Sequence, residues 1–431
     1  MRTILKVSFL IISLSFVGAN RLFAEPAPKA AVPPLELKAV LDEALEHNPA
    51  LAAAKARWEE AKKKITASWA LPDPTVGMDL MGSEVETAAG PQMQRMEVTQ
   101  QIPFPAKLWE RRKAAKSEAR AAHHEYLSVR RVLIRDVKKT YYELYGVDSA
   151  LGTLEEIRSV LEKFENVAQA RYANRSGAQR DVAKSQAEVS LTLEQNYLLL
   201  QQRESLAARL KVLLNRGPME EIGAAVQPEK PQVNETFFEL FNQAIEKRDE
   251  IKKTEALVDK ARQEKHLAGM QNLPDLNAGF RYTWVGSGMT TNARDGADSW
   301  EFPIAINVPL WQNRIVPEIQ AAAKAVDAAA AELQVTRNET YYEVRDAYTR
   351  FEASSKIALL YESAVLPQAK LALNSDQSAY ESGSAGFLEL LDSERVYLNA
   401  RLSYSRIYSE LLKSHADLEW ASGASLEGGK S

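Results

Sequence analysis

Two carboxylates near the C-terminus have a spacing that could do chemistry. Glu389 and Asp392 are three residues apart, so on a helix they share one face. Carboxylates held close together repel one another, which raises their pKa values and attracts cations. A ring of such pairs would form a cation-binding constriction, whereas one pair on a solvated helix face would have no special role. The spacing alone is compatible with both interpretations.

Half of the eight methionines form a second candidate group, within one short stretch of the chain. The four residues are Met78, Met81, Met93 and Met96. Thioethers are soft ligands for Cu(I), so a metal site is one interpretation. Met78 and Met96 also fit the apolar face of a strand, and that second interpretation requires no metal.

The chain has none of the short motifs that carry common enzymatic chemistry. It contains no cysteine, no G-x-S-x-G or H-E-x-x-H sequence and no glycine-rich phosphate loop. We therefore expect neither an enzyme nor a bound cofactor. The net charge of -4 indicates no polybasic surface, so we also expect no nucleic-acid partner.

The N-terminus has the layout of a secretory signal peptide. Basic residues precede an apolar run from Val7 to Val17 that is too short to span a bilayer, and Ala24 is a candidate cleavage end. We expect a signal peptide at 1–24 and a flexible, Ala- and Pro-rich leader at 25–34. No later run of 18 apolar residues follows. The sequence thus predicts an exported chain without membrane-spanning helices, either periplasmic or an outer-membrane β-barrel.

Four sequence landmarks occur twice, in the same order and at offsets between 200 and 206 residues. The paired segments are 45–51 with 245–251, 71–73 with 273–275, 102–103 with 308–309, and 140–143 with 340–343. Such repeats decide architecture before any single motif does. The expected boundaries are a first repeat at 35–215, a linker at 216–235, a second repeat at 236–422 and a flexible tail at 423–431.

Each repeat contains a very long helical segment. Residues 106–170 contain no proline and carry one apolar stripe with a coiled-coil period. At 1.5 Å per residue this helix would be roughly 100 Å long. The second repeat has a similar segment at about 317–375, in which Pro367 should cause a kink. A further helix follows each one, and a soluble coiled-coil rod would explain this part of the pattern.

Each repeat also contains one predicted β-hairpin, at about 74–104 and 276–311. Large apolar side chains alternate with small or polar ones along the last strand: Trp300, Phe302, Ile304, Ile306 and Val308. Four strands are half the minimum for a transmembrane barrel, and open sheet edges are not tolerated in lipid. If this face contacts lipid, several chains must therefore pool their strands. A small soluble sheet packed on a core is the alternative.

Two hairpins within duplicated long helices, behind a signal peptide, resemble the TolC family of outer-membrane efflux proteins from about Leu35 to Ser422. The segments that carry the resemblance are His47-Asn48-Pro49, the strand exits 101–104 and 307–310, and the two turns around 171–186 and 380–394. The resemblance implies a mainly α fold with a membrane β-barrel. Three chains would form an α-barrel tunnel, and the four strands of each would join a 12-stranded outer-membrane barrel.

The resemblance also implies where the duct closes. Glu389 and Asp392 match the carboxylates of the family's periplasmic constriction, so they are the expected gate and cation stricture. Asp181 and Tyr380 match a pair that links the two repeats near this gate.

One departure from the family lies in the periplasmic turns. Arg175 occupies a position where the family usually has glycine, as Gly383 does in the second turn. Because arginine adopts a positive φ only at a cost, we expect the two turns to differ in shape, with Gly177 as the substitute glycine.

By resemblance, the function is a passive exit duct, with most of its mass in the periplasm, docked by a periplasmic adaptor that links it to an inner-membrane pump. The segment Gln101-Ile102-Pro103-Phe104-Pro105 resembles members that serve heavy-metal pumps of the resistance-nodulation-division type. Heavy-metal or drug efflux is therefore the favoured cargo class. The alternatives are a type I secretion duct and, in a different class, a soluble periplasmic coiled-coil adaptor, which would not need detergent to stay in solution.

Overall fold

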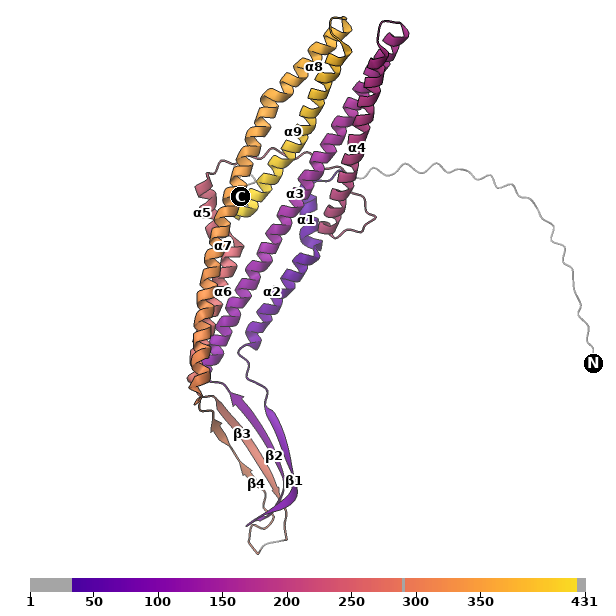
Figure 1. Ribbon diagram of the computed structural model, residues 1–431. Coiled ribbons are helices and arrows are strands. Elements are labelled where there is room, and N and C mark those ends of the chain that lie inside the picture. The colour runs from indigo at the N-terminus through magenta and orange to yellow at the C-terminus, as the bar shows by residue number, and fades with distance from the viewer. Residues whose placement is uncertain (1–32, 289–290, 425–431) are drawn as a thin grey trace, which may run out of the picture.

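The computed structural model describes residues 33–288 and 291–424. The expected signal peptide, most of the leader and the last seven residues of the tail lie outside these ranges. The described chain is elongated, with a β-sheet at one end and the turns of two helical hairpins at the other (Figure 1). Its C-terminal end lies about midway between them.

The first repeat begins with a pair of short helices broken at Asn48-Pro49. Its elements are α1 (Leu37–His47), α2 (Pro49–Ala67), β1 (Thr75–Thr87), β2 (Gly90–Ile102), α3 (Pro105–Ala173) and α4 (Gln179–Leu214). The Asn48 side chain accepts hydrogen bonds from the backbone N–H groups of Ala50 and Leu51, which caps α2. Its amide also donates to the carbonyl of Leu213 at 2.9 Å, so the break is tied to the end of α4.

The second repeat has the same order of elements. They are α5 (Phe237–Lys247), α6 (Asp249–Gly269), the 3₁₀ turn η1 (Met270–Asn272), β3 (Leu276–Val285), β4 (Ser299–Glu301), β5 (Ile304–Ile306), α7 (Gln312–Leu360), the π-helical turn η2 (Tyr361–Val365), α8 (Leu366–Glu381) and α9 (Phe387–Ser422). Thr236 and Glu239 form a capping box that begins α5.

The long helices differ between the repeats at one point. Helix α3 continues for 69 residues without a break. In the second repeat, the kink predicted at Pro367 takes the form of the π-helical turn η2, which lies just before the proline. Pro367 has no N–H to donate to the carbonyl four residues earlier, so the regular hydrogen-bond ladder is lost there. This turn separates α7 from α8.

The four expected strands form a single antiparallel sheet in the order β1-β2-β3-β4, with β5 also paired to β3. The first hairpin is longer than its sequence suggested, because β1 and β2 extend to a turn at Thr87–Gly90. The last strand is shorter: the continuous strand predicted for 300–310 is divided into β4 and β5 at Pro303. Proline cannot donate to a sheet ladder, so it interrupts the strand at the open edge.

The buried side chains form three clusters along the helices. One surrounds Val137 and Leu210 where α3 meets α4, one surrounds Leu390 nearer the turns, and one surrounds Val344 and Leu411 where α7 meets α9. Within the described residues, no helix has both the length and the apolar composition needed to cross a membrane.

Candidate gate at the helix turns and apolar face of the sheet

The two turns at the helical end have the same backbone conformation. Arg175, between α3 and α4, has a φ of 57°, and Gly383, between α8 and α9, has a φ of 79°. The N–H of Arg175 donates to the carbonyl of Tyr172 at 3.0 Å, and that of Gly383 donates to Tyr380 at 3.1 Å. The N–H of the next residue donates to the carbonyl five residues earlier in both turns. Ser176 donates to Arg171, and Ser384 donates to Ala379, each at 2.9 Å.

The prediction that the turns differ in shape is therefore wrong. Arg175 itself adopts the left-handed conformation that glycine adopts cheaply, and Gly177 does not replace it. Gly177 is needed for another reason, since a Cβ at this position would lie 2.9 Å from the Cβ of Arg171. A non-glycine residue in this region costs on the order of 1–3 kcal/mol, so the first turn holds strain that the second lacks.

The expected gate carboxylates lie on the first turns of α9, and both are exposed. Glu389 Oε2 accepts a hydrogen bond from the N–H of Gly386 at 3.1 Å, which places it at the N-terminus of the helix. Asp392 follows one turn later and lines the same shallow groove. The opposite wall of this groove includes Lys184 of α4. Arg395 of α9 and Glu188 of α4 form an ion pair that also lines the groove.

The expected pair Asp181 and Tyr380 has other partners in this single chain. Asp181 lies beside Arg180, with 3.6 Å between Oδ1 and Nε. Tyr380 is buried, and its ring lies 5.6 Å from the ring of Phe387. The direct link between the repeats at this level comes from Arg171, whose guanidinium lies 4.1 Å from the Tyr380 ring centroid. The hydrogen bond between Asp181 and Tyr380 stays a prediction.

Arg171 and Glu394 are two residues near the turns whose roles the sequence reasoning missed. Glu394 of α9 is 2 % exposed, and its Oε2 has no hydrogen-bond partner within the described residues. It lies on the same helix face as Leu390 and Leu398, which belong to the apolar cluster around it. Burial raises the pKa of Glu394 to about 7, against a weaker opposing effect of Arg401. The signal in the sequence that could have indicated this burial is the position of Glu394 on the apolar stripe of the helix.

The π-helical turn is held by a polar contact from the inter-repeat linker. Glu362, within the turn, accepts hydrogen bonds from Lys230 of the linker at 2.7 Å and from Tyr404 of α9 at 2.8 Å. Burial works against ionisation, but these two donors hold the pKa of Glu362 below its ordinary value. The linker therefore connects the break in the α7–α8 rod to α9.

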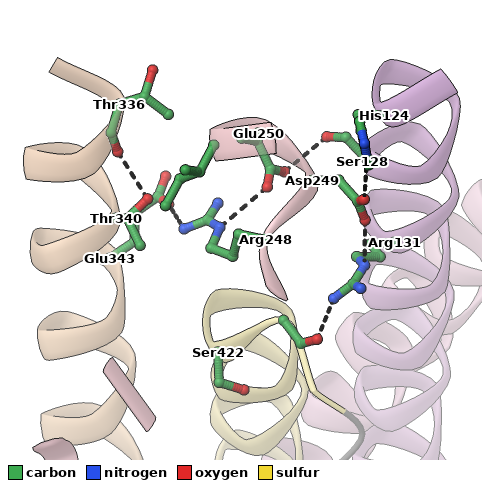
Figure 2. A network of polar contacts seen from close by, with 12 residues as sticks. His124, Ser128, Arg131, Arg248, Asp249, Glu250, Thr336, Thr340, Glu343 and Ser422 are labelled. Carbon is green, nitrogen blue, oxygen red and sulfur yellow. Dashed lines mark hydrogen bonds and ion pairs between the residues drawn. The ribbon is translucent and has the colours of Figure 1, made fainter. Parts of the chain in front are cut away.

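A partly buried ionic network joins the helices at mid-height, between the turns and the sheet. Figure 2 shows Arg131 of α3 reaching Asp249 at the start of α6, with 2.8 Å between Nε and Oδ2. Arg131 also donates to the carbonyl of Gly423 at the end of α9. Arg248, which is nearly fully buried, pairs with Glu343 of α7. Four helices from both repeats are thus fixed together here, while the turns lie far from this network.

The opposite end of the chain presents a sheet with two unlike faces. One face carries the exposed side chains of the predicted lipid-facing strand: Trp300, Phe302, Ile304, Ile306 and Val308. On the other face Arg281 lies between Glu97 and Glu301, at 3.0 Å from each. An apolar face of this kind suits lipid, and a charged face suits a water-filled interior.

The methionine group lies in the first hairpin of this sheet. Met78 and Met96 are directly opposite each other in β1 and β2, on the apolar face. Met81 and Met93 follow toward the far end of the hairpin, and the sulfur of Met93 approaches Gly286. Within residues 33–288 and 291–424, no cluster of three or more His, Asp or Glu side chains could hold a metal ion. The expectation of no metal site stays a prediction, with these methionines as the weak candidates for one.

Comparison with known proteins gives the same architecture. The family model described as "Outer membrane efflux protein" matches residues 40–216 and 240–424, which is both repeats. The outer membrane protein TolC of Vibrio cholerae serotype O1 is 23 % identical over 401 residues, covering 90 % of each chain.

Solved channel structures are also similar in fold. VceC of Vibrio cholerae has a TM-score of 0.74 at 20 % identity, covering 91 % of this chain and 97 % of its own. CusC has a TM-score of 0.75 at 16 % identity, covering 90 % and 92 %.

Proposed function

Because this chain belongs to the outer membrane efflux protein family, we propose that it is the outer-membrane exit duct of a tripartite efflux system. It conducts substrate passively to the outside from an inner-membrane pump, to which a periplasmic adaptor connects it. The sheet lies in the outer membrane, and the helices extend into the periplasm.

The observation that carries this proposal is the sheet with an apolar face and two open edges. Among residues 33–288 and 291–424, β1 pairs only with β2, and the β4–β5 edge pairs only with β3. Unpaired backbone groups cannot face hydrocarbon, so a lipid-facing sheet of this kind must close on further copies. Three copies supply twelve strands, an even number within the range of outer-membrane barrels. The functional unit is accordingly a homotrimer, and its long helices enclose the periplasmic tunnel.

The turns at the far end of the helices form the gate of this duct. Glu389 and Asp392 from three copies would form rings of carboxylates around the axis, which favour cations over anions. The ionic network at mid-height fixes the helices, so movement concentrates in the segment beyond it. Arg171 and Tyr380 join the two hairpins in that segment and favour the closed state.

The pump selects the cargo; the resemblance of segment 101–105 favours heavy-metal ions, and drugs are the other class that an efflux duct of this type would carry. The similarity to CusC concerns the fold only, because the identity is 16 %. The duct itself contributes charge selectivity at the gate.

The test of this proposal is the mass of the purified chain with and without detergent. An exit duct is a trimer that precipitates when the detergent is removed, because its apolar sheet faces are exposed. A monomer that stays in solution without detergent would contradict the proposal and leave a soluble coiled-coil protein instead.

A further inference from the structure

A cavity of about 600 Å³ lies between α3, α4 and α9. Its floor includes Val147 and Ala150 of α3, which are both buried. Leu198 of α4 and Leu402 of α9 line its walls, and Leu198 is 61 % exposed. The cavity therefore presents apolar surface to water, and its volume is that of a site for a small organic molecule.

One cation that lines this cavity has no partner. Arg406 of α9 makes no ion pair or hydrogen bond with the described part of the chain. The other three charged residues of the cavity pair with one another, since Lys413 lies 2.8 Å from Glu143 and 2.9 Å from Glu410. These four charges cancel overall. An anion would therefore be held by direct contact with the free guanidinium of Arg406, and not by a general positive field.

The same cavity contains an acceptor without a donor. Gln195 of α4 lines it, and the Oε1 atom of this residue is buried with no hydrogen-bond donor among the described residues. Buried acceptors are normally paired. A ligand that carries an N–H or O–H group would supply the missing donor. An apolar wall, a free cation and a free acceptor together are the lining of a small-molecule site.

Arg406 lies on the same face of α9 as the gate carboxylates. It follows Asp392 by fourteen residues, which is two heptads, so both belong to one stripe of a coiled-coil helix. The hydroxyls of Tyr404 and Tyr408, two residues before and after Arg406, reach the π-helical turn and the inter-repeat linker. Residues two apart differ by about 200° around a helix, so the linker lies on the opposite side. With the gate carboxylates around the axis, the cavity opens into the tunnel.

The acidic gate is too far away to repel an anion at this cavity. Fourteen residues of helix separate Asp392 from Arg406 by about 21 Å along α9. The Debye length at physiological ionic strength is about 8 Å. The charge of the gate is therefore screened at the level of Arg406.

Resting on the duct proposed above, we infer that this cavity binds an amphipathic organic anion, so that each copy presents one such site in the tunnel wall. The anionic group pairs with Arg406, the apolar part lies against Leu198 and Leu402, and a donor on the ligand meets Gln195. Of the two cargo classes, this site fits drug-sized organic molecules and not bare metal ions.

Fluorescence titration of the detergent-purified protein with 8-anilinonaphthalene-1-sulfonate tests this inference. The compound combines a sulfonate, aromatic rings and one N–H group, and N-phenyl-1-naphthylamine has the same rings and N–H group without the sulfonate. Each signal is corrected for the same detergent without protein. Arg406→Gln should weaken binding of the sulfonate at least about tenfold and leave binding of the uncharged compound unchanged. Arg406→Lys should keep most of the affinity, and Leu198→Ser should weaken binding of both compounds.

The control variant is Arg209→Gln, which removes another exposed arginine of α4 that does not line the cavity. It should bind both compounds like the parent. An equal loss with Arg209→Gln, or sulfonate binding that Arg406→Gln leaves unchanged, overturns the inference. Unchanged binding of the uncharged compound to Leu198→Ser overturns the apolar part of the site.

Bilayer recordings separate this inference from the proposed duct. The sulfonate should reduce the current of the parent, and the current of Arg406→Gln should resist it. Binding that depends on Arg406 without any block of the current would overturn the position in the tunnel. A conducting trimer whose sulfonate binding ignores Arg406 overturns the site and leaves the duct, whereas a monomer whose binding depends on Arg406 leaves the site and overturns the duct.

Discussion

Arg171 and Tyr380 join the two hairpins where α3 and α8 end. The Arg171 guanidinium lies 4.1 Å from the ring centroid of Tyr380, and its Nη2 donates to the Tyr380 carbonyl at 3.0 Å. One contact uses the face of the ring and the other uses the backbone, so neither uses the phenol hydroxyl. A cation–π contact of this kind contributes on the order of 1–2 kcal/mol.

Replacing Arg171 should therefore weaken the closed state of the gate. We expect Arg171→Ala to raise the single-channel conductance in planar bilayers, because it removes the link between α3 and α8. Tyr380→Phe is the matched comparison, since it keeps both the ring and the carbonyl and should conduct like the parent. An increase with Tyr380→Phe and none with Arg171→Ala would instead support the hydrogen bond between Asp181 and Tyr380.

The gate carboxylates should determine charge selectivity. We expect the double variant Glu389→Ala and Asp392→Ala to lose cation selectivity, measured as the reversal potential in a salt gradient. The double variant Glu46→Ala and Glu59→Ala changes the net charge equally at exposed positions far from the turns, and it should behave like the parent. Equal selectivity in the parent and the gate variant would rule out the carboxylate ring.

The backbone strain at Arg175 should be measurable as a change in the free energy of unfolding when the strain is removed. Arg175→Gly should raise the free energy of unfolding by about 1 kcal/mol, because glycine adopts the observed φ of 57° without a steric penalty. Gly383→Ala should lower it by a similar amount, since it introduces the same strain into the second turn. Thermal melting of the two variants beside the parent checks this, and a destabilised Arg175→Gly would contradict the equivalence of the turns.

Glu394 should make the protein less stable as the pH rises. Burial raises its pKa from the ordinary value of 4.5 to about 7 in the folded chain, so the folded state holds one extra proton between these pH values. The free energy of unfolding therefore falls as the pH rises from 4.5 to about 7, by roughly 3 kcal/mol. Above about pH 7 it falls no further on account of this group. This direction is opposite to that of a salt-bridged carboxylate.

The isosteric variant Glu394→Gln checks this effect, because it keeps the shape and cannot ionise. Its melting temperature should exceed that of the parent at pH 8, and the difference should shrink at pH 5. The exposed residue Glu381 on α8 supplies a control, Glu381→Gln, without this pH dependence. A parent and a Glu394→Gln variant that differ equally at both pH values would show that Glu394 is not protonated in the folded chain.

The repeats, the long helices and the hairpins were predictable because each follows from a periodic pattern. Apolar residues at helical spacing predict α3, and strict alternation predicts the strands, since one buried or lipid-facing side is required in both cases. The break at Asn48-Pro49 was also predictable, because proline and an Asn cap act locally.

The details near the turns were not predictable, because they depend on contacts between distant segments. Arg175 adopts a glycine-like φ only because the surrounding turn fixes it, and Arg171 meets Tyr380 across 209 residues of sequence. The division of the last strand follows from Pro303, which cannot donate to the ladder; the alternation of apolar residues across 300–310 conceals this break. Glu394 looks like any surface glutamate until its position on the apolar stripe is considered.

The central claim, that this chain forms a duct with a narrow acidic gate at its helical turns, is tested most directly by single-channel conductance of the detergent-purified protein in planar bilayers. The claim predicts small, cation-selective currents for the parent and larger currents for Arg171→Ala. A verified trimer that conducts no ions in either form, or that prefers anions, would contradict it.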